Sequence, residues 1–316
     1  MIEVIVAKIA RAAEGILDIE LRGPHGGNLP SFDPGAHVDV QLREGLVRQY
    51  SLCNDPIDPT RYRLGVGRSP TSRGGSAYVH ESLQVGDTLR IGEPRSLFAL
   101  SAEATCHRFI AGGIGITPIL SMIRWCHRHE LPWRLSYCVR SRAHAGYLDE
   151  LLGLGGEIRL YADDEMASPH DVSGMLADTK PAEHVYCCGP GGLMDAVATS
   201  ARDLGIEANR VHFERFGAPA DDRGHGGQKS FTVTLARNGA RYLVKPDESI
   251  LDCLERHGLT PPFSCREGLC RSCETGIVSG EADHRDYVLS AEEQREGKSL
   301  MICVSRATTQ ELVIDL

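Results

Sequence analysis

The chain has 316 residues, 41% of them hydrophobic and 24% charged, a composition typical of globular proteins with about two or three domains. Its formal net charge of −9 disfavours a nucleic-acid-binding surface. Charged residues interrupt the N-terminal segment, and no apolar run approaches the ~18 residues of a membrane span. We therefore expect a cytoplasmic protein with no signal peptide, no membrane segment and no nucleic-acid partner.

Residues 1–103 are predicted to form an antiparallel β-barrel. Short alternating runs, such as His37–Leu42 and Thr88–Ile91, are separated by Gly, Pro and Asp. Farther along, Gly74-Gly75-Ser76 precedes a short predicted helix. Such a turn offers free N–H groups and the positive end of the helix dipole to an anion. The pattern predicts a phosphate site in this domain.

Residues 104–217 are predicted to form an α/β domain with a parallel sheet. Continuous apolar strands alternate with helical stretches, which is typical of βαβ units. The strands are Phe109–Ala111, Leu135–Val139 and Val185–Cys188, and the helical stretches are Pro118–His129 and Leu193–Leu204.

A glycine-rich turn, Ala111-Gly-Gly-Ile-Gly-Ile-Thr-Pro118, follows the first of these strands and opens a helix. Strand, glycine turn and helix together favour a pyrophosphate site, although an ordinary βα turn remains the alternative. The candidate cofactor-binding residues are Gly112, Gly113, Gly115, Thr117 and Pro118.

A polar linker rich in Gly and Pro, residues 218–229, leads to a small α+β domain at 230–316. Asn238-Gly239 between two strands predicts a type I′ hairpin turn, with positive φ at both residues. A helix over Ser249–His257 with Gly258 as its C-terminal cap follows, and Glu311–Leu316 is the closing strand.

Four cysteines in this last domain are candidate metal ligands: Cys265, Cys270, Cys273 and Cys303. Their C-x4-C-x2-C spacing, with the fourth cysteine after 29 intervening residues, is typical of a plant-type [2Fe–2S] cluster. Gly268 lets the loop fold closely around the sulfurs. Structural zinc and unligated thiols are the alternatives. We expect the other seven cysteines to be reduced packing residues, at positions 53, 106, 126, 138, 187, 188 and 253.

The segment Ser279–Leu289 (SGEADHRDYVL) resembles the ferredoxin domain of the phthalate dioxygenase reductase family, the flavin and iron–sulfur reductases that serve Rieske oxygenases. The resemblance covers nearly the whole chain. It implies an FMN-binding barrel, a ferredoxin-reductase-like NAD(H)-binding domain and a β-grasp [2Fe–2S] ferredoxin domain.

The resemblance also assigns flavin-binding roles. Arg48-Gln-Tyr-Ser-Leu52 is similar to the family's flavin strand: Arg48 would pair with the flavin phosphate, Tyr50 would pack against the isoalloxazine, and Ser51 would reach flavin N5. Gly74, Gly75 and Ser76 would hold the phosphate of FMN. The chain contains no evident insertion that would grip an adenosine, so FMN is favoured over FAD.

Two further motifs resemble the nicotinamide end of the family's site. In Cys187-Cys-Gly-Pro190, Cys188 and Gly189 would border the nicotinamide ring. In Val211–Gly217 (VHFERFG), Phe216 would shield one flavin face until nicotinamide displaces it. A buried thiol and an interdomain packing residue are the alternatives. The catalytic candidates are Ser51, Cys188 and Phe216.

The choice of nucleotide is open at Arg140-Ser-Arg-Ala-His144. Relatives that prefer NADH often carry an acidic residue in this region, and an acid would bind a ribose 2′-hydroxyl, whereas arginines could accept a 2′-phosphate. We expect NADH, with NADPH as the alternative.

The three redox groups imply an electron relay. A nicotinamide gives up two electrons as hydride, a [2Fe–2S] cluster accepts one at a time, and a flavin mediates between them. The resemblance implies transfer to a separate Rieske-type oxygenase or O-demethylase, with a cytochrome P450 as runner-up, from a monomeric reductase. A ferredoxin-like carrier or redox sensor with non-functional flavin and nucleotide domains is the alternative from another class.

Two expectations concern the surface of the ferredoxin domain. Residues 266–272, including Arg266, Glu267 and Arg271, would form the docking surface for the partner. His284 would brace the cluster domain against the flavin domain.

Overall fold

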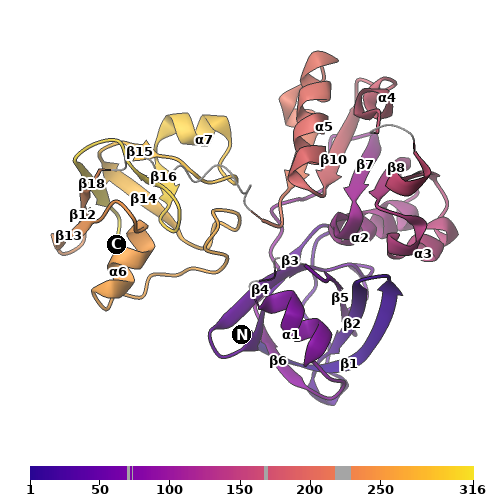
Figure 1. The fold of residues 1–316 in the computed structure, drawn as a ribbon, viewed down its shortest axis with the longest axis horizontal. Coiled ribbons are helices and arrows are strands. Elements are labelled where there is room, and N and C mark those ends of the chain that lie inside the picture. The colour runs from indigo at the N-terminus through magenta and orange to yellow at the C-terminus, as the bar shows by residue number, and fades with distance from the viewer. Residues whose placement is uncertain (70–71, 73, 167–169, 218–228) are drawn as a thin grey trace. The chain divides into compact units, whose positions relative to one another are not determined.

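The computed structural model describes residues 1–69, 72, 74–166, 170–217 and 229–316, so all of the predicted linker except Lys229 lies outside the described residues. The chain divides into two compact units, Met1–Glu214 and Arg215–Leu316 (Figure 1). The domain boundaries predicted within and between these units stay predictions.

The first unit begins with a six-stranded antiparallel sheet in the order β4-β3-β6-β1-β2-β5. An isolated bridge between Leu52, which follows β4, and Leu64 of β5 joins the two edge strands. The sheet therefore closes into the predicted barrel around a core that includes Val38 and Val40. Its elements are β1 (Ile2–Ala13), β2 (Ile16–Arg22), η1 (Pro24–Gly26), β3 (His37–Arg43), β4 (Leu46–Ser51), β5 (Tyr62–Gly67), α1 (Gly75–Glu81) and β6 (Thr88–Ile91).

The first unit continues with a five-stranded parallel sheet in the order β11-β10-β7-β8-β9. The strands are β7 (Cys106–Gly112), β8 (Trp133–Val139), β9 (Glu157–Ala162), β10 (Glu183–Cys188) and β11 (Val211–Glu214). The α-helices are α2 (Ile116–Arg128), α3 (Leu148–Gly153), α4 (Val172–Leu176) and α5 (Gly191–Asp203). Single turns of 3-10 helix are η2 (Gly113–Gly115), η3 (Arg142–His144), η4 (Asp163–Glu165) and η5 (Ala208–Arg210).

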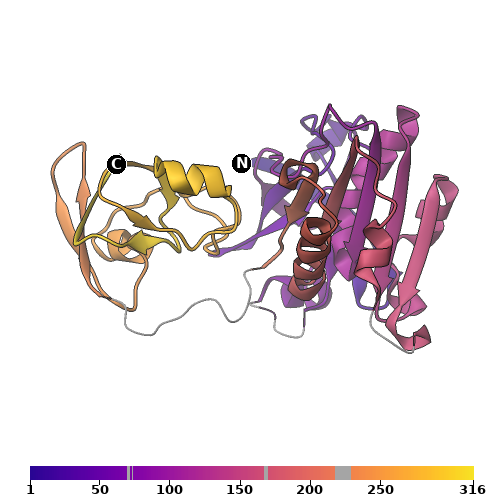
Figure 2. The same ribbon diagram turned by 90° about the horizontal axis from the view of Figure 1, so that it is seen from above.

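Helices cover both faces of this parallel sheet (Figure 2). Phe109 packs with α2 on one face, whereas its neighbour Ile110 packs with α4 and α5 on the other. Burial on both faces explains the apolar run Phe109–Ala111 of β7, and the predicted α/β architecture is confirmed.

The barrel and the parallel sheet pack closely through β5. A Cβ atom added to Gly65 would lie 2.4 Å from Thr117 Cγ2 and 2.8 Å from Tyr147 Oη, so only glycine allows this approach. Beside it, Arg63 pairs with Asp18 of the barrel at 3.0 Å and with Glu150 of α3 at 2.9 Å. These contacts hold residues 1–214 together as one unit.

The second unit has a five-stranded mixed sheet in the order β13-β12-β18-β14-β16, with α6 packed against it. Ile250, Leu251 and Leu254 of α6 are fully buried in its core. This α+β unit agrees with the predicted ferredoxin fold. Its elements are β12 (Phe231–Leu235), β13 (Arg241–Val244), α6 (Ile250–Arg256), β14 (Glu274–Ser279), β15 (Ala282–Asp283), α7 (Ala291–Glu296), β16 (Ser299–Met301), β17 (Arg306–Ala307) and β18 (Glu311–Ile314).

One turn prediction in this unit is wrong and one helix prediction is confirmed. Gly239 has φ +71°, but Asn238 does not have positive φ, and the turn extends from Leu235 to Ala240. Asn238 Oδ1 instead accepts a hydrogen bond from the Ala240 N–H at 2.9 Å, which favours a longer loop over a two-residue type I′ turn. Gly258 ends α6 with φ +79°, as expected.

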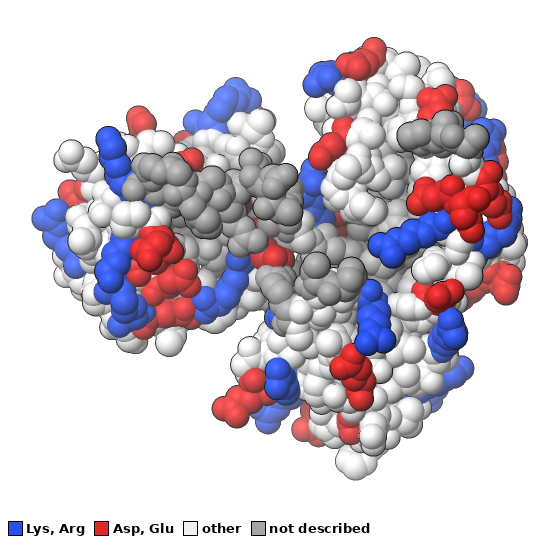
Figure 3. Space-filling view, viewed as in Figure 1, with Lys and Arg blue, Asp and Glu red and all other residues white. Residues whose placement is uncertain are grey.

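The surface carries interspersed charges of both signs on the face shown in Figure 3. Within the parts of the chain that are described, no helix is long and apolar enough to span a membrane. All eleven cysteines are free, and of the seven predicted packing cysteines only Cys106 is more than marginally exposed.

Candidate functional site

Strand β4 places Arg48 against the glycine turn that opens α1. A Cβ atom added to Gly75 would lie 2.6 Å from Arg48 Cγ and 3.0 Å from its Nε, so the guanidinium stem crosses the turn directly. Gly74 adopts φ +89°, a left-handed conformation that glycine takes at little cost. The structure therefore brings the predicted arginine and both predicted glycines together, with the donors that a phosphate requires.

Ser76 takes part in the same turn. Its hydroxyl donates to Ser72 Oγ at 3.0 Å and accepts from the Ser69 N–H at 3.2 Å. Two residues after Arg48 on β4, burial raises the pKa of Tyr50 to about 12, so its ring stays neutral and suits packing against another aromatic ring.

Ser51, at the end of β4, meets the last residue of β11. The Ser51 hydroxyl donates to Glu214 Oε2 at 3.5 Å, and only 4% of Ser51 is exposed. Glu214 is the register partner of Cys188 on the neighbouring strand β10. Two catalytic candidates from different sheets therefore lie on either side of one carboxyl group.

Glu214 is a functional candidate that the sequence reasoning missed. Burial raises its pKa to about 8, partly opposed by the hydrogen bond from Ser51, so the carboxyl holds a proton at neutral pH. Burial likewise raises the pKa of the Cys188 thiol, and the nearby Glu214 adds to the effect. His37 completes the cluster, with its Nδ1 3.8 Å from Glu214 Oε1. The available signal was an acidic residue within a half-apolar strand, VHFE.

The glycine turn after β7 packs against the turn after β10. A Cβ atom on Gly112 would lie 2.5 Å from Pro190 Cδ, and one on Gly115 would lie 2.1 Å from the Cys188 carbonyl oxygen. Gly189 in turn would meet Gly112 Cα at 2.8 Å. These glycines bring two strand ends into direct contact and place the N-terminus of α2 beside Cys188.

The other three residues predicted on this turn have distinct environments. Gly113 adopts φ +53° with open space around its Cα. Thr117 donates to the Ile114 carbonyl at 3.0 Å, and its methyl group packs on Gly65 of the barrel. Pro118 lies in the first turn of α2 and is buried. Phe216, the remaining catalytic candidate, belongs to the second unit and is 46% exposed, so its shielding role stays a prediction.

The cysteine loop of the second unit directs backbone donors at a sulfur atom. Cys265 Sγ accepts hydrogen bonds from the N–H groups of Glu267 at 3.3 Å and Leu269 at 3.4 Å. Cys270 Sγ lies 3.3 Å from Ser272 Oγ. Hydrogen bonds with Cys270 and Cys303 lower the pKa of Cys265, so these thiols lie within contact distance of one another.

The donor set fits a [2Fe–2S] cluster. Cys270, Cys273 and Cys303 are each less than 9% exposed, and the cluster needs four thiolates shielded from water with N–H donors nearby. Among the described residues, no three His, Cys, Asp or Glu side chains are arranged to hold a single metal ion. A two-iron cluster does not require such a group, because each iron takes only two of the four thiolates.

Two arginines hold the loop in an unusual conformation. Arg266 and Arg271 have φ +58° and +55°, a region that L-residues rarely adopt. Arg266 pairs with Asp252 of α6 at 3.1 Å, and Arg271 pairs with Glu293 of α7 at 2.8 Å.

These contacts change the expected docking surface. Glu267 is only 8% exposed and is therefore not part of an open surface. Both arginines are engaged in ion pairs within the unit, so reversing their charge would also disturb the loop. His284 lies 3.6 Å from Asp286, whose Cβ is 3.1 Å from the Cβ position of Gly268, and its bracing role between domains stays a prediction.

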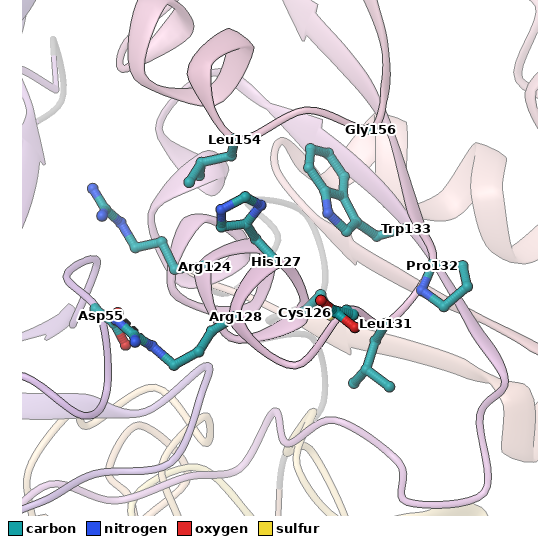
Figure 4. A pocket seen from close by; sticks show the side chains of 11 residues that line it. Asp55, Arg124, Cys126, His127, Arg128, Leu131, Pro132, Trp133, Leu154 and Gly156 are labelled. Atoms are coloured by element: carbon teal, nitrogen blue, oxygen red, sulfur yellow. Dashed lines mark hydrogen bonds and ion pairs between the residues drawn. The ribbon is translucent and has the colours of Figure 1, made fainter.

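A cavity of about 910 Å³ lies at the other end of α2, which is about 20 Å long (Figure 4). Arg128 pairs there with Asp55 of the barrel, and Arg124 pairs with Glu150. Trp133 closes one side. None of the predicted site residues lines this cavity, so it is separate from the candidate cofactor sites.

Comparison with known proteins identifies two domains. Residues 233–308 match the family described as a 2Fe-2S iron-sulfur cluster binding domain. Residues 93–211 match the N-terminal domain described as dimethylamine monooxygenase subunit DmmA-like.

Curated relatives match the chain over its full length. Phenoxybenzoate dioxygenase subunit beta from Ectopseudomonas oleovorans is 42% identical over 98% of this chain and 95% of its own. Vanillate O-demethylase oxidoreductase from a Pseudomonas species is 38% identical over 100% of both.

Solved structures show the same fold. The structure of phthalate dioxygenase reductase, described as modular for electron transfer from pyridine nucleotides to [2Fe-2S], matches with a TM-score of 0.74 and 38% identity over 100% of this chain and 98% of its own. An intact type IV self-sufficient cytochrome P450 monooxygenase matches with a TM-score of 0.90 and 35% identity over 99% of this chain and 41% of that longer one.

Proposed function

The chain belongs to the phthalate dioxygenase reductase family, and we propose that it takes hydride from NADH to FMN and passes single electrons through a [2Fe–2S] cluster to a separate Rieske-type oxygenase or O-demethylase. It is an oxidoreductase that uses a flavin, a pyridine nucleotide and an iron–sulfur cluster, and its partner is a separate oxygenase component. FMN, NADH and the Rieske type of the partner are the finer parts of the proposal.

The observation that carries the proposal is the meeting of Ser51, Cys188 and Glu214. Ser51 comes from the flavin strand and Cys188 from the nicotinamide motif, and a protonated carboxyl group lies between them. Hydride transfer depends mainly on holding two rings in contact, because correct positioning supplies much of the rate. We infer that the Ser51 hydroxyl orients the flavin edge, while Cys188 and Gly189 form the wall against which the nicotinamide rests.

The remaining site residues would bind the flavin and the iron–sulfur cluster and shield them from water. Arg48, Gly74, Gly75 and Ser76 would hold the flavin phosphate, and Tyr50 would cover the ring. A bound flavin would supply the chemistry that links a two-electron hydride donor to a one-electron acceptor. Cys265, Cys270, Cys273 and Cys303 would hold the cluster, with the N–H groups of Glu267 and Leu269 compensating the charge on one sulfur.

A cytochrome P450 partner is the second candidate. It is favoured by the P450 monooxygenase in which a segment of similar fold is part of a longer chain. The full-length relatives are named as a dioxygenase subunit and an O-demethylase oxidoreductase, and these names favour a separate, non-P450 partner instead. Two smaller inferences accompany the proposal: the protein is a monomer, and its eleven free thiols suit a reducing compartment such as the cytoplasm.

The first experiment is an anaerobic titration of the purified protein with NADH, followed by visible absorbance. We expect flavin bands over a broad iron–sulfur background, both bleached by NADH. A protein with an iron–sulfur spectrum that NADH does not bleach would support the carrier or sensor alternative instead.

A matched pair of cysteine variants tests the catalytic assignment. Cys188→Ala should slow flavin reduction by NADH roughly tenfold, because the wall behind the nicotinamide is lost. Cys187→Ala, which alters the neighbouring residue packed on the opposite face of β10, should leave that rate unchanged. Equal rates in the two variants would contradict the role of Cys188.

A further inference from the structure

Two loops after adjacent strands meet at the carboxyl edge of the parallel sheet. One follows β8 and contains η3, and the other follows β9 and contains η4. The N–H of Asp164 donates to the carbonyl of Arg140 at 3.2 Å, which ties the two loops together. The glycine turn follows β7, the next strand in the sheet, so all three turns open on the same edge.

The loops are joined by a two-point ion pair. Arg142 Nε donates to Glu165 Oε1 at 2.6 Å, and Arg142 Nη2 donates to Glu165 Oε2 at 3.2 Å. This fork geometry is the one with which an arginine would grip a phosphate, and the carboxylate occupies it instead.

The charges around this pair are predominantly negative. Asp163, Asp164 and Glu165 outnumber the exposed Arg140 and Arg142, and Asp163 also pairs with His170 at 2.8 Å. In a dinucleotide-binding sheet the pyrophosphate lies at the first glycine turn and the adenosine ribose extends over the neighbouring strand end. Here the neighbouring strand is β8, whose loop carries Arg140 and Arg142. The three carboxylates follow β9, and their loop is hydrogen-bonded to the loop after β8, so a 2′-phosphate would meet both the arginines and these acids.

We propose that Glu165, by engaging both donor edges of Arg142, makes the chain select NADH over NADPH. The inference deepens the proposed function and rests on it. The 2′-hydroxyl of NADH loses no binding free energy when Arg142 is paired with Glu165, because the hydroxyl carries no charge that requires an arginine. A dianionic 2′-phosphate would have to displace Glu165 from Arg142 and would then lie next to three acids. The loops would therefore reject NADPH by charge repulsion as well as accept NADH.

The test compares kcat/KM for NADH and NADPH, with a dye that accepts electrons from the flavin, in the holoprotein. Glu165→Gln keeps the size of the side chain and releases Arg142. It should raise kcat/KM for NADPH roughly fivefold, the upper end of what an exposed ion pair contributes, and leave the value for NADH within about twofold.

A second exposed pair of a glutamate and an arginine, on β9, provides a matched control. Glu157 pairs with Arg159 at 2.5 Å at the opposite end of β9, and both are exposed. Glu157→Gln makes the same change in net charge and should leave the ratio of the two nucleotides unaltered. An equal rise in NADPH use by both glutamine variants would overturn the proposal in favour of a general charge effect.

A second variant tests whether Arg142 is the group that is released. Adding Arg142→Ala to Glu165→Gln should remove most of the gain with NADPH. An undiminished gain in the double variant would overturn the part assigned to Arg142. A wild-type protein that oxidises neither nucleotide contradicts the proposed function itself, whereas one that oxidises NADH but shows no effect of Glu165→Gln contradicts only this inference.

Discussion

The cysteine loop of the second unit and the Ser51–Cys188–Glu214 cluster of the first are built in opposite ways. The loop brings three of its four candidate ligands from nine consecutive residues, and ion pairs to α6 and α7 hold it. The cluster combines residues from β4, β10 and β11 that lie as many as 163 positions apart. A local site can be recognised by its spacing, whereas a site assembled from distant strands becomes visible only in the folded chain.

The largest effect is expected in the local site. Cys270→Ser should prevent stable cluster assembly, because one of four thiolates is lost. Iron content and transfer to an oxygenase partner should fall to background, while reduction of a flavin-directed dye by NADH continues. Cys253→Ser, which alters a buried cysteine outside the loop, is the control. Loss of dye reduction in the Cys270 variant alone would show that the two sites are not independent.

The flavin phosphate turn provides the next largest effect. Gly75→Ala would place a Cβ atom 2.6 Å from Arg48 Cγ, so either the arginine or the turn must move. Flavin affinity should weaken roughly tenfold, corresponding to the loss of one charge-assisted contact. Gly153→Ala in α3, where the added atom meets open space, should bind flavin normally. Fluorescence titration of the flavin-depleted proteins measures both.

Glu214 gives the assembled site a pH signature. Its pKa is raised to about 8, so the folded chain holds a proton that the unfolded chain releases above pH 4.5. The stability that this proton contributes is fully present below pH 4.5 and is lost as pH rises through 8. Between pH 5 and 9 the first unit should lose roughly 4 kcal/mol of folding stability, and Glu214→Gln should flatten that dependence. Urea unfolding at a series of pH values tests it, and an unchanged slope in the variant would contradict the assignment.

A smaller pH dependence of folding stability, with the opposite sign, is expected from histidines of the parallel sheet. Burial, together with the charge of nearby histidines, lowers the pKa of His107 and His212 to about 4. Each favours the folded state fully above its usual pKa of 6.5 and loses that contribution as pH falls towards 4. His107→Phe should reduce acid destabilisation by about 1 kcal/mol, allowing for partial solvent screening. Acid unfolding that is identical in the variant and wild type would argue against this contribution.

The sequence predicted features whose causes are local. The alternation of His37–Leu42, the apolar run of Phe109–Ala111 and the capping glycine Gly258 each depend on neighbours in the chain, and the structure confirms all three. Asn238 was predicted wrongly because the turn length depends on how β12 and β13 pair. Glu214 was missed because its importance comes from Ser51, a residue on another sheet, and no spacing rule links them. The pairing of Arg142 with Glu165 was hidden for the same reason.

Gly65 has a consequence for recombination between related reductases. Because Thr117 and Tyr147 fill the space where its side chain would be, the barrel and the nucleotide-binding sheet are shaped to each other. A chimera that joins this barrel to the nucleotide-binding domain of another reductase would keep Gly65 but lose the side chains that pack against it. An exchange made between Glu214 and Arg215 leaves that fit intact, so the first 214 residues are the natural block for grafting onto another electron acceptor.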